Sequence, residues 1–231
     1  MTSSRIDRYK EAYPYPRRLF IRGILRAGIS FFTGLLTRLS VEGRENLPDK
    51  GPLIVVFNHF HFLDAVVAIQ VMPWPLEFLA DFEMPNVSPL LKVFPDLYGT
   101  YDVAQGLPNL DALRASEAIL AQEGVLGIFP EGRIEHPTLR PALPGAAFVA
   151  LRTGAPIVPV GIFSEDDWDI PGTIRREKRR LSVTCRIGEV FGPLEVENRR
   201  RPSRDAIDLA GEKIMAAIAA QLPPDVRGAY G

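Results

Sequence analysis

The stretch that decides the fold is LIVVFNHFHFLD, residues 53–64, in which five apolar residues are followed at once by polar ones. Such a run predicts a buried strand over Leu53–Phe57, and the apolar residues of Ala65–Val71 predict a helix after it. His59 and Asp64 then lie in the turn between strand and helix. An imidazole that titrates near neutrality, with a carboxylate to fix its tautomer, has the two parts of a general base. The competing interpretation is a histidine satisfied within the turn and an aspartate that caps the helix.

Strands and helices alternate along the rest of the chain. This alternation predicts an α/β fold in which a mixed, mostly buried sheet is flanked by helices. We expect two segments: an arm and helix over residues 1–40, and one α/β domain over residues 41–231. The expected strands are Leu53–Phe57, Leu76–Ala80, Tyr98–Val103, Val125–Phe129, Ile157–Phe163 and Leu181–Ile187, and the expected helices are Ala65–Val71, Pro89–Val93, Asn109–Gln122, Gly145–Arg152 and Arg204–Gln221.

The composition narrows the class of protein. With 231 residues, 46% of them apolar, the chain can build one substantial core. Its 27 basic and 28 acidic residues nearly cancel, so bulk charge gives no indication of nucleic acid as a partner. The single cysteine, Cys185, excludes a disulfide within the chain and a cysteine-based zinc site. Cys185 lies in an alternating strand pattern, which favours a core thiol in a reducing, cytoplasmic compartment.

The N-terminal region predicts an amphipathic helix over Leu19–Leu39, preceded by a loosely held arm over Met1–Pro16. Its longest uncharged part, Ala27–Thr37, is far shorter than the roughly 20 apolar residues that a spanning helix needs. We therefore expect the helix to lie in a membrane interface. The alternative is a helix packed on the domain with its arginines facing water. The polar stripe comprises Arg18, Arg22, Arg26, Ser30, Thr33 and Thr37, and the apolar remainder comprises Phe20, Ile21, Ile24, Leu25, Phe31, Phe32, Leu35, Leu36 and Leu39.

A second polar turn, Pro130-Glu131-Gly132-Arg133, follows the expected strand Val125–Phe129. Its backbone N–H groups and the guanidinium of Arg133 suit a phosphate or a carboxylate, while Glu131 could orient Arg133 or hold a substrate hydroxyl. Alone, this turn is typical of a surface turn with a salt bridge. Ligands of open α/β sheets gather outside the carboxyl ends of strands, so two such turns together indicate a site.

Together these residues resemble the glycerolipid acyltransferase family, which contains the 1-acylglycerol-3-phosphate acyltransferases. The first motif of that family, Asn-His-x4-Asp, is matched by Asn58, His59 and Asp64, and the third by residues 130–133. The fourth motif, a strand with an internal proline, is matched by Ile157–Val160. The resemblance covers roughly residues 40 to 190. A membrane-docking helix at the N-terminus is also familiar from the family.

The resemblance implies an O-acyltransferase of phospholipid biosynthesis on the cytoplasmic face of the membrane, peripheral or monotopic. His59, held by Asp64, would take the proton of an acceptor hydroxyl, whose oxygen would attack the thioester of an acyl-CoA or acyl-carrier protein. No acyl-enzyme, cofactor or metal is implied, and the sequence has no Gly-x-Ser-x-Gly elbow. The partners implied are membrane lipids and the acyl donor. The implied acceptor-binding residues are Asn58, Gln105, Glu131, Gly132 and Arg133.

Two positions depart from the family pattern. Gln105 stands where the second motif usually has an arginine, and a neutral amide binds a phosphate dianion more weakly than a guanidinium does. The acceptor is therefore 1-acylglycerol-3-phosphate, a lysophospholipid diester or a lipid without phosphate. His61 replaces the usual small hydroxyl residue, for which local packing at the mouth of the site is our expectation.

Two other classes of protein compete with this interpretation. A metal-dependent hydrolase would need more ligands than His59, His61 and His136, the three histidines of the chain, and an aspartate where Leu63 stands. A non-catalytic lipid-binding protein would fit the substitution at Gln105. The basic run over residues 174–180 allows either a solvated loop or strand edge, or attraction to anionic headgroups or to the phosphates of a CoA donor.

Overall fold

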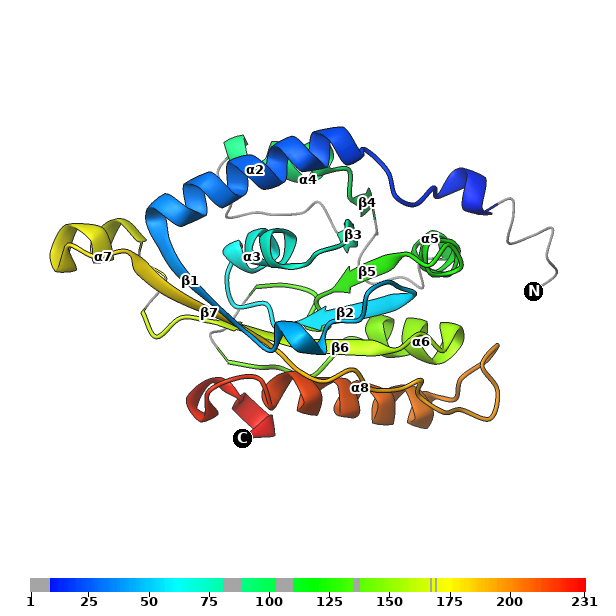
Figure 1. Ribbon diagram of the computed structural model, residues 1–231. Helices are drawn as coiled ribbons and strands as arrows, with labels where there is room; N and C mark the ends of the chain where they lie inside the picture. The colour runs from blue at the N-terminus through cyan, green and yellow to red at the C-terminus, as the bar shows by residue number, and fades with distance from the viewer. Residues whose placement is uncertain (1–8, 81–88, 103–109, 135–137, 167, 169) are drawn as a thin grey trace.

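The computed structural model describes residues 9–80, 89–102, 110–134, 138–166, 168 and 170–231. Its centre is a seven-stranded sheet with the order β1-β7-β6-β2-β5-β3-β4, covered by helices on both faces (Figure 1). All neighbouring strands run parallel except β6 and β7, which are antiparallel. The strands are β1 Thr37–Glu42, β2 Leu53–Phe57, β3 Leu76–Ala80, β4 Tyr101–Asp102, β5 Val125–Ile128, β6 Ile157–Phe163 and β7 Leu181–Ile187. The expected mixed α/β sheet is thus confirmed.

The helices form two layers with separate apolar cores. One core lies between the sheet and α5, α6 and α8, and the other lies between the sheet and α3 and α4, with α2 outside it. Every residue of β2 and β6 is buried, because both strands are covered on their two faces. The helices are α2 Leu19–Leu36, α3 Leu63–Val71, α4 Pro89–Tyr98, α5 Leu110–Leu120, α6 Pro144–Thr153, α7 Ile170–Glu177 and α8 Arg204–Ala219, with short 3-10 turns at Arg44–Asn46, Pro224–Val226 and Gly228–Tyr230.

Three expectations about secondary structure are wrong. The strand expected at Tyr98–Val103 begins only at Tyr101, because α4 continues past Val93 to Tyr98. The N-terminal helix ends at Leu36 rather than Leu39, because Thr37–Glu42 pairs in parallel with β7 as an edge strand. The expected division at residue 40 falls inside this strand. The basic run expected on a loop or strand edge belongs largely to α7, whose Pro171 is tolerated in the first turn of a helix. Cys185 does lie buried in β7, where desolvation raises the pKa of its thiol to about 12.

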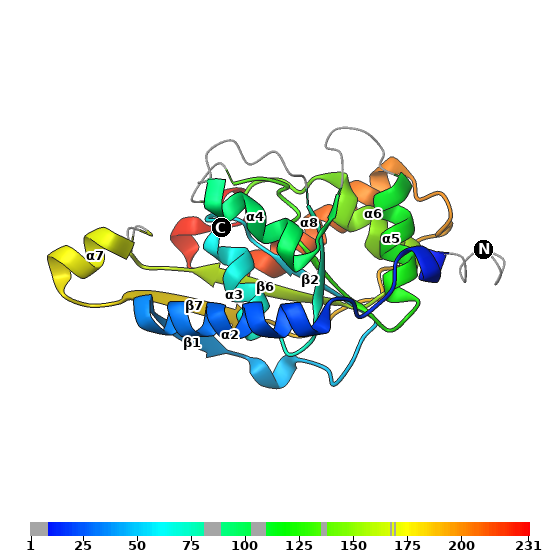
Figure 2. The same cartoon turned by 90° about the horizontal axis from the view of Figure 1, so that it is seen from above.

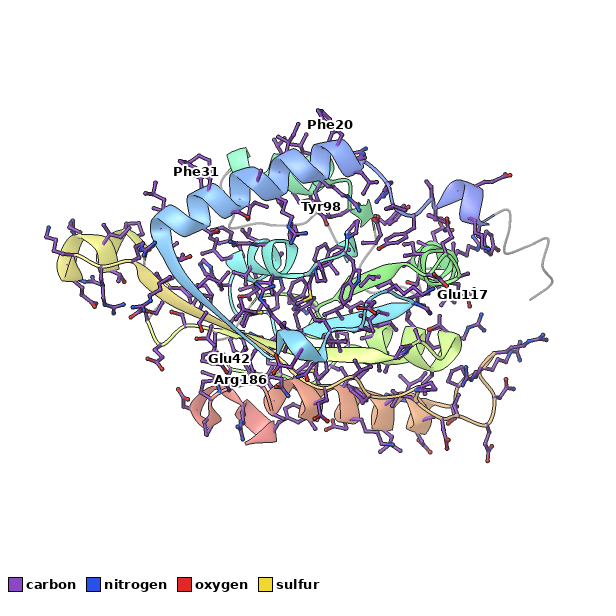
Figure 3. All side chains as sticks on the ribbon, viewed as in Figure 1. Phe20, Phe31, Glu42, Tyr98, Glu117 and Arg186 are labelled. Atoms are coloured by element: carbon purple, nitrogen blue, oxygen red, sulfur yellow. The ribbon has the colours of Figure 1, made fainter. Side chains whose placement is uncertain are left out.

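The helix α2 is turned the opposite way from a helix on a water-soluble domain. Arg22 is only 5% exposed, whereas Phe20 is 81% and Phe31 is 68% exposed (Figure 3). The helix does pack on the domain, as the alternative expects, but Arg22 is buried rather than facing water. Within the described residues, α2 is also the helix that is long and apolar enough to cross a membrane. Its outward residues are Leu19, Phe20, Ile21, Ile24, Phe31, Phe32 and Leu35.

Buried polar contacts attach α2 to the domain. The Arg22 guanidinium donates two hydrogen bonds to the Glu77 carboxylate on β3, at 2.6 and 2.7 Å, and a third to the carbonyl oxygen of Tyr98. Further along the helix, the Thr33 hydroxyl donates to the side chain of Gln70 on α3. The segment before α2 is also anchored, since the Tyr15 hydroxyl donates to the carbonyl of Pro75. The arm is therefore held more firmly from Tyr15 onward than the sequence predicts.

Candidate active site

The two polar turns meet at the carboxyl ends of neighbouring strands. The parallel pairing of β2 with β5 sets Val56 beside Ile128, so the turns that follow them lie side by side. The His59 ring stacks on the Phe129 ring with 4.1 Å between centroids, and the backbone N–H of His59 donates to the Glu131 carboxylate at 2.9 Å. The parallel register of the sheet therefore brings together two motifs that are 72 residues apart.

Within the first turn, His59 faces Asp64. The Nδ1 atom of His59 lies 3.4 Å from Oδ2 of Asp64, and the His59 side chain is 17% exposed while that of Asp64 is fully buried. The contact is longer than a normal hydrogen bond, as catalytic contacts often are before substrate binds. Because Nδ1 faces the carboxylate, Nε2 is the ring nitrogen that can exchange a proton with a bound molecule.

The Asp64 carboxylate is held by the turn rather than by the helix. Its Oδ2 atom also accepts hydrogen bonds from the backbone N–H groups of Phe60 and His61, each at 2.7 Å, while Oδ1 has no partner among the described residues. Both donors precede α3, so the competing interpretation of Asp64 as a cap for the N–H groups of that helix is wrong. Burial raises the pKa of Asp64, and its hydrogen bonds to His59 and to the turn oppose that shift.

The side chain of Asn58 bonds to the neighbouring strand β6. This side chain is completely buried. The amide donates to the carbonyl of Ile162 at 2.8 Å and accepts from the N–H of Ile162 at 2.7 Å. Asn58 therefore joins the end of β2 to β6, and this placement favours a structural contact over the expected contact with the acceptor.

Glu131 joins the two turns to a third segment. One carboxylate oxygen accepts from the His59 N–H, and the other accepts from the N–H of Arg140 at 3.2 Å. Leu143, in the same third segment, also contacts the second turn, because its N–H donates to the carbonyl of Pro130 at 2.8 Å. Burial raises the pKa of Glu131, and these hydrogen bonds oppose the shift. Both carboxylate oxygens face backbone donors, so this placement favours positioning over the expected contact with the acceptor.

The guanidinium groups near this turn come from Arg133 and Arg140. Arg133 is exposed, and Arg140 is half-buried with Nη2 3.5 Å from the carbonyl oxygen of Glu131. Gly132, directly before Arg133, has φ +77°, a backbone conformation that favours glycine, and a Cβ atom there would also displace the end of the Leu143 side chain. Sequence reasoning missed Arg140, because nothing in the run before Pro141 marks it as a neighbour of Glu131.

Three other residues named from the sequence are Gln105, His136 and His61. Gln105 lies outside the described residues, as does His136. The His61 ring stacks on that of Trp168, with 4.9 Å between centroids and 13° between planes, which agrees with the expected packing role. Across the described ranges, no group of three His, Cys, Asp or Glu side chains could hold a metal ion.

The fold and the paired turns define an acyltransferase, and comparison with known proteins agrees. The chain belongs to the Acyltransferase family, whose model matches residues 38–163. It is 29% identical over 173 residues to the 1-acyl-sn-glycerol-3-phosphate acyltransferase of Borreliella burgdorferi, covering 74% of this chain and 68% of that relative. It is 25% identical over 199 residues to the human 1-acyl-sn-glycerol-3-phosphate acyltransferase alpha, covering 83% of this chain and 67% of that one.

A solved structure shares the fold. The 1-acyl-sn-glycerophosphate acyltransferase PlsC from Thermotoga maritima aligns with a TM-score of 0.58 at 21% identity, over 91% of this chain and 83% of that one. The predicted family is thus confirmed, and the chain is an O-acyltransferase. The site residues themselves stay predictions, to which the geometry above gives a physical basis.

Proposed function

We propose that this enzyme transfers a fatty acyl group from acyl-CoA or acyl-carrier protein to the free hydroxyl of 1-acylglycerol-3-phosphate. The names of the relatives support this acceptor, and the pairing of His59 with Asp64 beside the turn of Arg133 is the observation that carries the reaction. An imidazole serves to activate the hydroxyl, and a nearby cationic turn serves to hold the phosphate.

The proposed reaction is a direct transfer. Nε2 of His59 takes the proton from the acceptor hydroxyl as its oxygen attacks the carbonyl carbon of the thioester. The carbon–sulfur bond then breaks, the ester remains on the acceptor, and the imidazolium returns the proton to the leaving thiolate. Asp64 stabilises the imidazolium from the Nδ1 side, where the attraction between opposite charges is strong because the carboxylate is buried.

The proposed acceptor site uses the two guanidinium groups rather than all the residues that the resemblance implies. Arg133 and Arg140 supply positive charge near His59. Glu131 holds the turn of residues 130–133 next to His59 through its hydrogen bond with the His59 N–H. Arg140 offers a guanidinium that could offset the amide at Gln105. A hydrogen bond between charged groups contributes about 1.5–3 kcal/mol, enough to favour a phosphate-bearing acceptor over a neutral one.

We further propose that α2 lies in the cytoplasmic membrane interface as a monotopic anchor. Its outward face carries phenylalanine, leucine and isoleucine side chains, whereas its inward face is attached to the domain through Arg22 and Thr33. Crossing the membrane would separate Arg22 from Glu77, and breaking a buried pair of charges costs about 3–5 kcal/mol. An interfacial position keeps that pair intact and buries the apolar face in lipid.

Replacing His59 by alanine tests the proposed base. General base catalysis contributes about 10²- to 10⁴-fold, so we expect His59→Ala to lower kcat by that factor with an unchanged thermal unfolding curve. His61→Ala, which removes a nearby imidazole that faces Trp168, is the matched control and should keep the rate within about tenfold. Wild-type turnover by His59→Ala would refute the mechanism, and no product with any thioester donor would favour the non-catalytic lipid-binding protein.

A panel of lyso-lipids tests the acceptor. With one labelled acyl-CoA, mass spectrometry should detect phosphatidic acid as the main product. Arg133→Ala should raise KM for the phosphate acceptor at least about tenfold, and should leave a phosphate-free acceptor unaffected. Faster transfer to a phosphate-free lipid, with no effect of Arg133→Ala on either acceptor, would favour the alternative acceptor.

A further inference from the structure

The helix α7 projects from the domain next to the membrane-facing helix. Figures 1 and 2 both place it beyond the C-terminal end of α2, at the end of the molecule opposite the loop between β7 and α8. The Arg180 guanidinium donates to the carbonyl oxygen of Gly34, in the last turn of α2, at 2.7 Å. We call residues 170–180 the α7 arm, and its base is thus continuous with the apolar surface of α2.

The α7 arm is attached to the domain by packing and ion pairs. Gly172 and Thr173 are buried, and Ile170 packs against the sheet core. The Arg179 guanidinium binds the Asp166 carboxylate at 2.5 and 2.9 Å, and the second carboxylate oxygen also accepts from the N–H of Ser182. The arm therefore presents its outer residues in a defined place.

The outer residues of the arm are basic. Five basic residues and one acidic residue lie between positions 175 and 180, and all of them are exposed. Arg179 is offset by Asp166 and Glu177, whereas the charges of Arg175 and Lys178 add to the outward field. Basic side chains do complement the C-terminal dipole of a helix, but that effect acts only within the last turn. Residues beyond Glu177 continue the cluster.

We propose that the α7 arm is a second, electrostatic membrane contact that binds the anionic headgroups of lipids beside the apolar face of α2. This inference rests on the proposed docking of α2, because an inserted α2 carries the arm toward the membrane surface, and charge attraction is screened beyond a Debye length of about 8–10 Å. Each basic residue at that distance is attracted to an anionic leaflet, whereas a zwitterionic leaflet gives no such attraction. The apolar face of α2 then sets how deeply the protein inserts into the membrane, and the charge of α7 sets its preference for anionic lipids.

Vesicle binding by the full-length protein tests the α7 arm. We compare the wild type, Arg175→Gln/Lys178→Gln and the control Arg200→Gln/Arg201→Gln, which removes two exposed charges from the loop at the opposite end. The arm variant should bind vesicles containing phosphatidylglycerol about 30-fold less tightly than the wild type, with a weaker salt dependence. Its binding to phosphatidylcholine vesicles and its thermal unfolding should be unchanged, and the control should keep wild-type binding to both.

The possible outcomes separate this proposal from the docking of α2. Equal binding by the arm variant and the wild type, or an equal loss in the control, would overturn the role of α7. A raised KM for acyl-CoA in detergent micelles, with unchanged vesicle binding, would overturn it in favour of the phosphates of the donor. Phe31→Ser/Phe32→Ser should lose binding to both kinds of vesicle, and failure of that result alone would count against α2 insertion while the α7 measurement remained valid.

Discussion

The helices α2 and α8 lie on opposite sides of the molecule and are amphipathic in opposite senses (Figure 1). In α8, Ile214, Met215 and Ile218 are buried completely against the sheet, as in a helix of a soluble protein. In α2, the buried residues are Arg22 and Thr33, and only the half-buried Leu25 and Ile29 pack against the core. Phe20 and Phe31 instead point away from the domain (Figure 3).

This difference shows that each helix is adapted to a different solvent. Apolar side chains are buried wherever water would otherwise surround them, and lipid removes them from water as well as a protein core does. The helix α8 obtains that burial from its own domain. The helix α2 is held by the Arg22–Glu77 ion pair, the Thr33 hydrogen bond and the packing of Leu25 and Ile29, which leaves its outer apolar face available to a membrane.

The largest expected effect comes from breaking the ion pair that attaches α2 to the domain. Removing one member of a buried charge pair costs about 3–5 kcal/mol, because the other charge stays buried without a partner. We expect Glu77→Gln to lower the free energy of unfolding by that amount in urea denaturation. Glu123→Gln, at the exposed pair with Lys50, is the control and should change stability by less than about 1 kcal/mol. Similar losses of stability in both variants would contradict the claim that the Arg22–Glu77 pair attaches α2 to the domain.

The same substitution placed in each helix sharpens the comparison. Ile214→Ala removes a fully buried side chain of α8 and should cost about 2–5 kcal/mol of unfolding free energy. Ile24→Ala removes a side chain of α2 that is 58% exposed, so its cost in solution should stay within about 0.5 kcal/mol. Denaturant unfolding measures both, and a large loss for Ile24→Ala would mean that α2 buries its apolar face.

Serine at the outer face of α2 should weaken binding to membranes without destabilising the fold. Burying a phenylalanine contributes about 1.5–3 kcal/mol, so Phe31→Ser/Phe32→Ser should reduce affinity for vesicles at least about tenfold. Leu209→Ser, on the exposed face of α8, removes a comparably exposed side chain and should leave vesicle binding unchanged. Equal losses in the two variants would indicate nonspecific adsorption.

Asp64 and Glu77 are both buried carboxyls, and their replacement should affect stability in opposite directions. Burial raises the pKa of Asp64, so the folded protein keeps the proton where the unfolded chain has lost it. The stability that protonated Asp64 gives the fold is fully present below the ordinary pKa near 4, and it is lost as pH rises through the raised pKa. Asp64→Asn should therefore gain Tm relative to the wild type as pH rises above about 4, while kcat falls about 10²- to 10⁴-fold. A Tm difference that does not change with pH would contradict the claim that burial raises the pKa of Asp64.

Most of the sheet could be predicted because its strands are short apolar runs that end in turns. Leu53–Phe57, Leu76–Ala80, Ile157–Phe163 and Leu181–Ile187 are found with the expected bounds. The strand Thr37–Glu42 was missed because its polar residues continue the stripe of the preceding helix, although the alternation of Leu39 and Val41 with polar residues favours a strand.

The site was predicted only as far as local spacing reaches. His59 and Asp64 are five residues apart, so the sequence alone could pair them. The roles of Asn58, Glu131 and Arg140 depend on hydrogen bonds between segments that only the folded sheet brings together. The inward face of α2 was unpredictable for the same reason, because Glu77 lies 55 residues from Arg22.

The rate of acyl transfer with the acceptor in two physical forms tests the central claim most directly. We measure the wild type and Phe31→Ser/Phe32→Ser with 1-acylglycerol-3-phosphate in vesicles, and with a short-chain analogue dissolved in water below its critical micelle concentration. The variant should lose at least about tenfold in rate on vesicles and keep the wild-type rate on the dissolved acceptor. Equal rates for both proteins on vesicles would contradict the claim that the outward face of α2 brings the site to the membrane.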